Sequence, residues 1–467
     1  MNKKKILSLV MSIVMTGTLL ASCGGGTQNA STDEDVTVIS LWVNNSHSKS
    51  VMDELVNEWN NTTGKEKGIK IDYVVKGDDY TSQLEMALNA DNPPDIFLKG
   101  ANAKNVENGV VATLTDYPKA VEWLKNYEGY IEYYSNPYYK GEQKIVTVPK
   151  GVGVYGLVYN KDMFKAAGIV DENGEAKPPK TYAEMIEYAK KLTNPEKKEY
   201  GIIFPVKWSG WTTTDIIYPA LVSGGKNSGY DRKTGTFDYS DIAPIMNAIL
   251  QIKHDGSCYP GAESLDNDPA RALFAEGRIG MKFSGDYDVG VFTNQFPAKC
   301  DWGVVEYPSE NADVRYKNPM IYTEGGVIST KAIERVGFEK VFEVYKWFNS
   351  DELVRELYKE GLIIPYKYDI YEDIVDECKM PQIAEFAKIT ENGANVMANI
   401  NSRPEGFTGQ SIQSLCANDF WYEKKPIEET LAEYSKACTE GIATYIEENP
   451  DYDTSPFIDP DWDIRLK

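Results

Sequence analysis

Residues 148–168, VPKGVGVYGLVYNKDMFKAAG, decide the fold. Pro149 and the three glycines that follow it predict an extended, mobile segment. The next residues, 154–159, form a short β-rich run. Asn160 can cap a helix that begins directly after it, and Gly168 stands where a helix favours a left-handed stop. A glycine-rich crossing, a strand and a short helix suit a chain that leaves one lobe and begins another.

The glycine spacing in this stretch also matches a nucleotide-binding motif. Gly151-x-Gly153-x-x-Gly156 has the pattern of dinucleotide-binding loops. Such a loop follows a strand and opens a helix on its last glycine, so that phosphate meets a helix N-terminus. Here the glycines precede a strand, and we interpret the match as chance.

Length and charge limit the class of protein. A chain of 467 residues is too long for one ordinary core, so two lobes or domains are expected. The hydrophobic content of 42% is that of a soluble globular protein. The net charge of −22 repels nucleic acid and anionic lipid, and neither is a predicted partner. The plainest interpretation of the charge is a solvated surface on a secreted protein.

The N-terminus predicts the compartment. Lys3, Lys4 and Lys5 precede an apolar run, 6–20, that is too short to span a bilayer. The run ends in Leu-Ala-Ser-Cys at 20–23, followed by three glycines. An ordinary secretory signal with a chance cysteine is one interpretation, but this order favours a bacterial lipoprotein signal. Residues 1–22 would be removed, Cys23 would carry the lipid, and 23–35 would tether an extracytoplasmic protein to the cell membrane.

The remaining cysteines do not form a recognisable site. They are odd in number, and none belongs to a CxxC pair: Cys258, Cys300, Cys378, Cys416 and Cys438. One disulfide and buried free thiols both remain open. No zinc or other metal site and no cofactor is predicted.

The first hundred mature residues alternate strands and helices. Strands are expected at 36–42, at 68–75 and from 93, with helices at 51–60 and 80–89. This order is typical of an open parallel sheet with helices on both faces. Because ligands of such sheets bind at the carboxyl ends of the strands, 44–47, 76–80 and 98–103 are expected near one crevice.

The rest of the chain continues the alternation. Thr181 and Glu184 have capping-box spacing at the start of a helix. Further helices are expected at 215–223, 242–255, 269–277, within 338–359, at 381–388, at 410–420 and from 426; strands at 201–205, 278–283 and 302–307; a hairpin or turn at 231–239; and further crossings at 321–329 and 362–365.

Several stretches together resemble the extracellular solute-binding lipoproteins of ABC importers, in the sugar-binding branch related to maltodextrin-binding protein. Besides the cysteine signal, they are NPPDIF at 92–97 with NGVVATLTD at 108–116, YNKDMFKAAG at 159–168, PKTYAEM at 179–185, FAEGRIGM at 274–281 and WGVVEYP at 302–308. The charged and aromatic pairs that mark the maltodextrin protein itself are not visible at the matching places.

The resemblance implies an α/β protein with two lobes, each a mixed, mostly parallel sheet flanked by helices, joined by a multi-segment hinge. Lobe I would comprise 36–152 and 324–363, and lobe II 153–323 and 364–467. A carbohydrate, most simply an oligosaccharide, would bind in the cleft without chemistry. A membrane permease and its ATPase would be the partners of a monomer.

A sugar pocket needs aromatic faces and planar hydrogen-bonding groups. With 9 Trp and 31 Tyr the chain has the aromatic area. Trp208 and Trp211 lie in a polar loop, where packing in a core is the poorer explanation. The predicted ligand-binding residues are Asn44, Asn45, Ser46, Lys99, Asn102, Tyr155, Trp208, Trp211, Asp286, Tyr287, Glu324 and Arg403.

Two other function classes stay open. A membrane-tethered glycosidase needs two carboxylates across a cleft, and 71 acidic residues always offer a pair. His47 and His254 are the only histidines, and zinc-protease, nucleophile-elbow, P-loop and EF-hand motifs are absent from the sequence, so no enzyme is predicted. A surface sugar adhesin or sensor is the other alternative. The sugar is not identified, and a polyol or peptide ligand is also open.

Overall fold

The computed structural model describes residues 36–44, 48–128, 131, 136–139, 142–224, 229–314, 316, 318–372, 374–391, 395–396, 411–450, 452 and 454–461. Residues Thr37–Lys467 form one compact unit, separate from Met1–Val36. No helix in the described part of the chain is long and apolar enough to cross a membrane.

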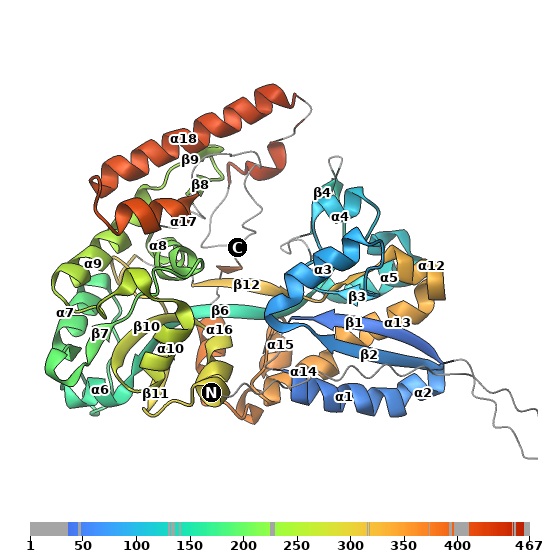
Figure 1. Cartoon of the computed structure of the whole chain (residues 1–467), viewed down its shortest axis with the longest axis horizontal. Helices are drawn as coiled ribbons and strands as arrows, with labels where there is room; N and C mark the ends of the chain where they lie inside the picture. Colours follow the sequence, from blue (N-terminus) through green and yellow to red (C-terminus); the bar gives the residue numbers. More distant parts are fainter. Residues whose placement is uncertain are drawn as a thin grey trace, which may run out of the picture. The chain divides into compact units, whose positions relative to one another are not determined.

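The first sheet has the order β13-β3-β1-β2. Its strands β1, β2 and β3 are labelled in Figure 1. Strands β1 (Thr37–Val43), β2 (Ile69–Val75) and β3 (Ile96–Phe97) are parallel, as predicted, and β13 (Val327–Ile328) is antiparallel to β3. Helix α1 (Lys49–Asn61) buries Met52, Val56 and Trp59, which share one face at helical spacing. Helix α3 (Tyr80–Asn89) follows β2, so the strand–helix alternation of the sequence gives the parallel order.

Strand β6 (Pro149–Asn160) is the centre of a seven-stranded sheet (Figure 1). Its first half pairs with β12 (Pro319–Glu324) and β14 (Ile364–Pro365), and its second half with β10 (Ile279–Gly285) and β11 (Trp302–Val305). Strands β7 (Tyr200–Ile202) and β15 (Asn395–Val396) complete this sheet. All three predicted crossings therefore meet as neighbouring strands.

The glycine-rich start of β6 corrects one expectation. We predicted a mobile segment before a strand, whereas the segment is part of a twelve-residue strand paired along both edges. A Cβ atom on Gly151 would lie 2.4 Å from Ile363 Cγ1, and one on Gly156 2.5 Å from the Val305 carbonyl oxygen. These glycines are explained by close packing.

The residues predicted to begin and end helices do so in the structure. Asn160 Oδ1 accepts a hydrogen bond of 3.0 Å from the Met163 amide at the start of α6 (Lys161–Ala166), and Gly168 has φ of 69°. Thr181 caps α7 (Tyr182–Leu192) through the Glu184 amide. The Glu184 carboxylate accepts from the Lys180 amide, one residue before the cap.

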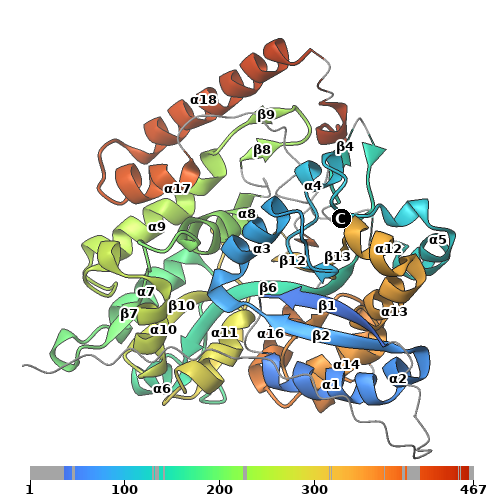
Figure 2. The same ribbon diagram turned by 45° about the vertical axis from the view of Figure 1, so that its right-hand side comes forward.

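The C-terminal helix α18 (Ile427–Glu448) lies beside the hairpin of β8 (Tyr230–Asp231) and β9 (Thr236–Phe237) in both views (Figure 2). The other helices are α2 (Thr63–Lys67), α4 (Ala103–Glu107), α5 (Pro118–Leu124), α8 (Tyr218–Gly224), α9 (Ala243–His254), α10 (Asn267–Ala275), α11 (Tyr287–Gly290), α12 (Thr330–Val336), α13 (Phe338–Phe348), α14 (Asp351–Lys359), α15 (Tyr368–Glu372), α16 (Pro381–Glu391) and α17 (Ile412–Leu415). A second small hairpin joins β4 (Tyr138–Tyr139) and β5 (Glu142–Gln143).

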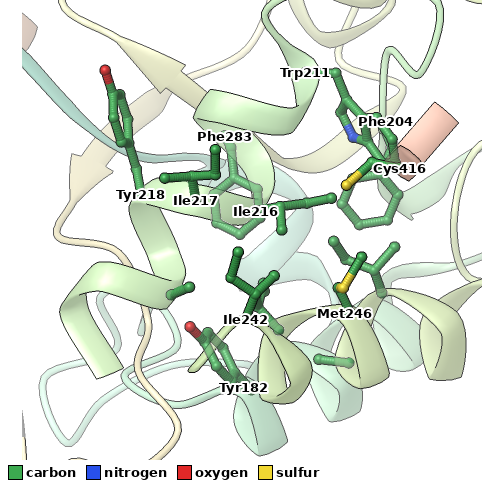
Figure 3. Close-up of a cluster of buried hydrophobic side chains, with 14 of the residues drawn as sticks. Tyr182, Phe204, Trp211, Ile216, Ile217, Tyr218, Ile242, Met246, Phe283 and Cys416 are labelled. Carbon is green, nitrogen blue, oxygen red and sulfur yellow. The ribbon is translucent and has the colours of Figure 1, made fainter. Parts of the chain in front are cut away.

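The buried apolar side chains form two large clusters. One gathers around α7, α8, α9 and α18, and Figure 3 shows part of it, with Ile216 and Ile217 beside Phe283. The other gathers around β1, α1, α13 and α14. None of the five described cysteines forms a disulfide, which resolves the disulfide alternative for these residues.

Candidate functional site

Three strand ends of the first sheet meet at one edge. The Lys76 amide, just after β2, donates to the Val43 carbonyl at 3.0 Å, and the Leu98 amide, just after β3, donates to the Trp42 carbonyl at 3.4 Å. Asn44 follows β1 directly. The polar segments expected around one crevice therefore begin side by side along this edge.

Two lysines lie against aromatic rings at this edge. Lys76 Nζ is 4.1 Å from the centroid of the Trp42 ring, and Lys99 Nζ is 5.8 Å from that of Tyr80. The Tyr80 hydroxyl donates to the Leu98 carbonyl at 2.7 Å. Our sequence reasoning named Lys99 but assigned no ligand role to Lys76, whose position after the second strand was the available signal.

The loop after β3, residues 98–102, joins two predicted site residues. Glu324, the last residue of β12, accepts a hydrogen bond of 2.6 Å at Oε2 from the Lys99 amide. Burial raises the pKa of Glu324 to about 7, although the amides of Lys99, Gly100 and Ala101 oppose the rise. The predicted site residues Glu324 and Lys99 are therefore in direct contact through this hydrogen bond.

Asn102 has a structural task in the same loop. Its Oδ1 atom accepts a hydrogen bond of 2.9 Å from the Asn105 amide and so caps α4. The Asn105 side chain donates to the Gly100 carbonyl at 2.9 Å and so ties the start of α4 to the loop. Contact of Asn102 with a ligand stays a prediction.

A second group lies where β6 and β10 run together. The Val154 amide donates to Asp286 Oδ1 at 3.2 Å, and the Asp286 amide donates to the Val154 carbonyl at 2.9 Å. Burial raises the pKa of Asp286 to about 7 against the effect of these amides. The structure thus brings together three predicted residues, Tyr155, Asp286 and Tyr287.

Tyrosine rings cover this group. The Tyr155 ring centroid lies 4.6 Å from that of Tyr218 and 6.0 Å from that of Tyr287, both at steep angles. Tyr287 is 37% exposed, so part of its ring is available to a ligand. Tyr218 is 2% exposed and supports Tyr155 from the core; the sequence did not mark it, because a tyrosine inside an expected helix does not differ from other core residues by pattern.

Buried charges lie next to Tyr287. The Arg271 guanidinium carbon is 5.7 Å from the Tyr287 ring centroid, and Arg271 Nε donates to Asp288 Oδ1 at 2.7 Å. Lys282 Nζ lies 3.3 Å from Asp288 Oδ2. Burial alone would raise the pKa of Asp288, but the Lys282 ammonium and the Arg271 guanidinium outweigh it, and this pKa lies below its ordinary value.

Asp215 adds an acid near this group. It is 1% exposed, and neither carboxyl oxygen has a hydrogen-bond partner among the described residues. Burial raises its pKa well above the ordinary value, and the Lys282 ammonium only partly offsets this. Burial therefore favours the neutral, protonated form of the Asp215 carboxyl group.

Of the two tryptophans in the polar loop, Trp211 differs from expectation, whereas the ligand role of Trp208 stays a prediction. Trp211 is 1% exposed and lies beside Phe204 and Cys416 (Figure 3); its ring stacks on Phe420 and meets Trp421 edge-on. It presents no free face, which favours packing in the core over a place in the ligand cleft. Trp208 is half-buried and covers Gly210, whose Cβ atom would lie 2.3 Å from the ring.

Four predicted residues lie outside the described residues: Asn45, Ser46, Arg403 and Cys23. The described residues contain no group of three or more acidic, histidine or cysteine side chains that could hold a metal ion.

One polar pocket, of about 550 Å³, lies away from the predicted ligand residues. It is lined by Ser40, Asp91, Asn92, Pro93, Asp95, Lys331, Glu334 and Arg335. Arg335 donates to both oxygens of Asp95 at 2.7 Å, and Asp95 also accepts from the Ser40 amide at 2.7 Å. Through these bonds Asp95, in the NPPDIF stretch, connects strand β1 to helix α12, so this stretch has a structural role.

Comparison with known proteins identifies the family. The model of the bacterial extracellular solute-binding protein family matches residues 45–354. An sn-glycerol-3-phosphate-binding periplasmic protein of Agrobacterium fabrum is 27% identical over 250 residues, which are 50% of this chain and 52% of that protein. A maltotriose-binding protein of Pyrococcus abyssi is 23% identical over 320 residues, which are 63% of this chain and 59% of that protein.

A solved structure supports the fold over most of the chain. The ABC substrate-binding protein Lmo0181 of Listeria monocytogenes, in complex with cycloalternan, superposes with a TM-score of 0.64 at 18% identity. The alignment covers 88% of this chain and 100% of that chain. The chain has the α/β periplasmic-binding-protein fold and belongs to the bacterial extracellular solute-binding proteins, a family that binds solutes and does not catalyse reactions.

Proposed function

We propose that this protein is the substrate-binding lipoprotein of an ABC importer. It captures a carbohydrate, an oligosaccharide in the first instance, in a cleft between two lobes and delivers it to a membrane permease driven by an ATPase. Cys23 carries the lipid that holds it at the outer face of the cell membrane. Lobe I comprises residues 36–152 and 324–363, and lobe II comprises residues 153–323 and 364–467.

The observation that carries the carbohydrate assignment is the tyrosine group at the β6–β10 junction. Tyr287 and the half-buried Tyr155 offer apolar ring faces beside the carboxyl group of Asp286, which can accept or donate a hydrogen bond near neutral pH, and the buried Tyr218 packs against Tyr155. Ring faces that stack on sugar C–H groups and a planar acceptor for hydroxyls are the two needs of a sugar pocket. A relative named as a maltotriose-binding protein and a protein of similar fold that was solved in complex with cycloalternan support the same class.

A phosphorylated polyol is the second ligand class, because of Lys76 and Lys99. Both ammonium groups lie at the carboxyl edge of the first sheet, and each contacts an aromatic ring. An ammonium group binds phosphate as a point charge, and relatives named for sn-glycerol-3-phosphate support this alternative.

A ligand panel with purified protein separates these classes. Neutral oligosaccharides such as maltotriose and raffinose are compared with sn-glycerol-3-phosphate by thermal shift, since a ligand at 100 times its Kd adds about 2.7 kcal/mol of stability. We expect a shift with a neutral oligosaccharide that persists in 0.5 M salt. A shift with the phosphate ester alone, lost in salt, would transfer the assignment to the second class.

The tyrosine group is tested on whichever panel member binds. Tyr287→Ala is expected to weaken binding at least tenfold, about 1.4 kcal/mol, while the ligand-free melting temperature changes little because the ring is partly exposed. Tyr422→Ala is the matched control, since Tyr422 is 58% exposed and lies on another segment. Equal affinity of both variants would remove Tyr287 from the site.

The import role is distinguished from a glycan-processing enzyme or a sugar sensor by two further measurements. Recovery of the added oligosaccharide unchanged after long incubation supports binding without chemistry. Uptake of the labelled sugar by cells must fall when the gene is deleted and return with the wild-type gene. Hydrolysis of the sugar, or uptake that is independent of the gene, contradicts the import proposal.

A further inference from the structure

We propose that Glu324 is a positioning residue, whose carboxylate holds the 98–102 loop in its binding conformation and fastens that loop to the crossing strand β12. The loop's role in capturing a ligand rests on the proposed function. The mechanical role of Glu324 rests on the contacts alone.

The loop needs an external acceptor to keep its shape. Lys99 has φ of 57°, a left-handed conformation that residues with a side chain seldom adopt. Gly100 is buried, and a Cβ atom there would lie 2.3 Å from Val327 Cγ2. This turn aims the amides of Lys99, Gly100 and Ala101 toward one carboxylate, in the manner of an anion-binding nest.

The other end of the contact is fixed by the crossing. The Gly325 amide donates to the Val148 carbonyl at 2.9 Å, and the Asn349 side chain donates to the Gly325 carbonyl at 3.1 Å. The Tyr345 hydroxyl donates to the Gly326 carbonyl at 3.1 Å. Gly325 and Gly326 suggest a flexible hinge by sequence, yet three hydrogen bonds hold their backbone. The carboxylate is therefore presented from a rigid base.

The contact spans two parts of the chain that would move together. Glu324 is paired with Pro149 at the start of β6, at the point where the β12 register shifts. The hydrogen bond from the Lys99 amide to Glu324 Oε2 is 2.6 Å long, so a displacement of Glu324 would lengthen this bond unless the Lys99 amide moved with it. The loop also carries the cap of α4 and, with Lys99, a cation of the proposed binding edge. Glu324 thus links the crossing to the loop that meets the ligand.

The charge state of Glu324 should govern the strength of this link. The titratable groups that face it are Lys99 from the loop, Tyr80 from α3 and Tyr345 from α13. Burial raises the pKa of both tyrosines, so they stay neutral, while burial raises the pKa of Glu324 to about 7. Protonation weakens the carboxylate as an acceptor for the amides, so the loop is held more firmly at pH 8 than at pH 6.

Amide hydrogen exchange of the ligand-free protein tests the proposal. Exchange at residues 98–102, corrected for the intrinsic pH dependence, is measured between pH 6 and 8 in wild type, Glu324→Gln and Glu324→Ala. We expect at least tenfold faster exchange of the Lys99 amide in Glu324→Ala. Glu324→Gln keeps an acceptor of the same shape, so it should restore part of the protection and abolish its pH dependence. Glu310→Gln, at an exposed position, is the control.

The outcomes are separable from those of the ligand panel. Unchanged protection of the Lys99 amide in both Glu324 variants overturns the inference, whichever solute binds. If Glu324→Ala does not fold, the loss of pH dependence in Glu324→Gln decides, and a pH dependence equal to that of wild type overturns the inference. Loss of protection in the variants supports it even where no sugar binds, in which case the proposed function alone fails.

Discussion

Lys282 and Asp288 form an ion pair in which both side chains are 1% exposed, with Nζ and Oδ2 3.3 Å apart. Arg271 and Ser284 also donate to Asp288, so the carboxylate has a full set of partners. The pair lies beside Tyr287 and holds the carboxyl end of β10 in place. Breaking such a pair from one side leaves a buried charge without compensation.

Asp288→Asn is therefore expected to lower the free energy of unfolding by about 3–5 kcal/mol at pH 7, measured by urea denaturation. Because the folded pKa of Asp288 lies below the unfolded value, its stabilisation is present above pH 4 or so and is lost as the pH falls through the folded pKa. The control is Asp268→Asn, whose side chain is 54% exposed and pairs with Arg271; about 0–1 kcal/mol is expected there. Equal effects of the two variants would contradict the buried-pair account.

Lys150 provides the opposite case, a buried cation in β6. It is 6% exposed, its Nζ atom lies 3.4 Å from the Phe348 ring centroid, and burial lowers its pKa to about 7. The folded state then holds fewer protons than the unfolded state between pH 7 and about 10.4, so stability rises with pH across this window, by at most about 1.4 kcal/mol per pH unit.

Lys150→Met removes the titrating group and keeps a similar length. We expect the variant to be more stable than wild type at pH 7, with a difference that shrinks as the pH rises to 9. Chemical denaturation at several pH values measures this, with the exposed Lys104→Met as control. A difference that is constant with pH would show that Lys150 keeps an ordinary pKa in the folded state.

Two glycines of β6 provide a matched pair. A Cβ atom on Gly156 would lie 2.5 Å from a backbone oxygen, whereas the nearest atom to one on Gly153 is 3.4 Å away. Gly156→Ala should therefore destabilise the protein by about 1–3 kcal/mol through overpacking, and Gly153→Ala should be nearly neutral. Thermal and urea denaturation measure both. A destabilised Gly153→Ala with an unaffected Gly156→Ala would contradict the packing explanation.

The strands and caps could be predicted because their signals are local. Alternating burial along β1, the cap at Asn160 and the left-handed Gly168 follow from residues within a few positions of one another. Strands of two residues, such as β13 and β14, have no such period and were found only through the glycines and proline near them. The glycines themselves had two explanations, and only the packing against Ile363 and Val305 decided between them.

The site was less predictable because its contacts are distant in sequence. Glu324 and Lys99 are 225 positions apart. Arg271 in α10 donates to Asp288 in α11, and strand β10 separates these two helices in the sequence. Nothing around Tyr218 differs from a core tyrosine by pattern. The polar loop around Trp211 was misleading, since the side chains that bury it, Phe420 and Trp421, come from another segment.

Trp211→Ala is expected to lower the free energy of unfolding by about 3–5 kcal/mol, because a buried indole would leave a cavity between Phe420 and Trp421. Trp208→Ala should cost less, since Trp208 is only half-buried where it packs over Gly210 and against the edge of the core cluster. If Trp208 stacks on a sugar, its variant loses about tenfold in affinity, close to 1.4 kcal/mol, with little change in melting temperature. Calorimetric titration and thermal melting of both variants separate the roles. Normal melting of Trp211→Ala together with weakened binding would return Trp211 to the binding site and contradict its place in the core.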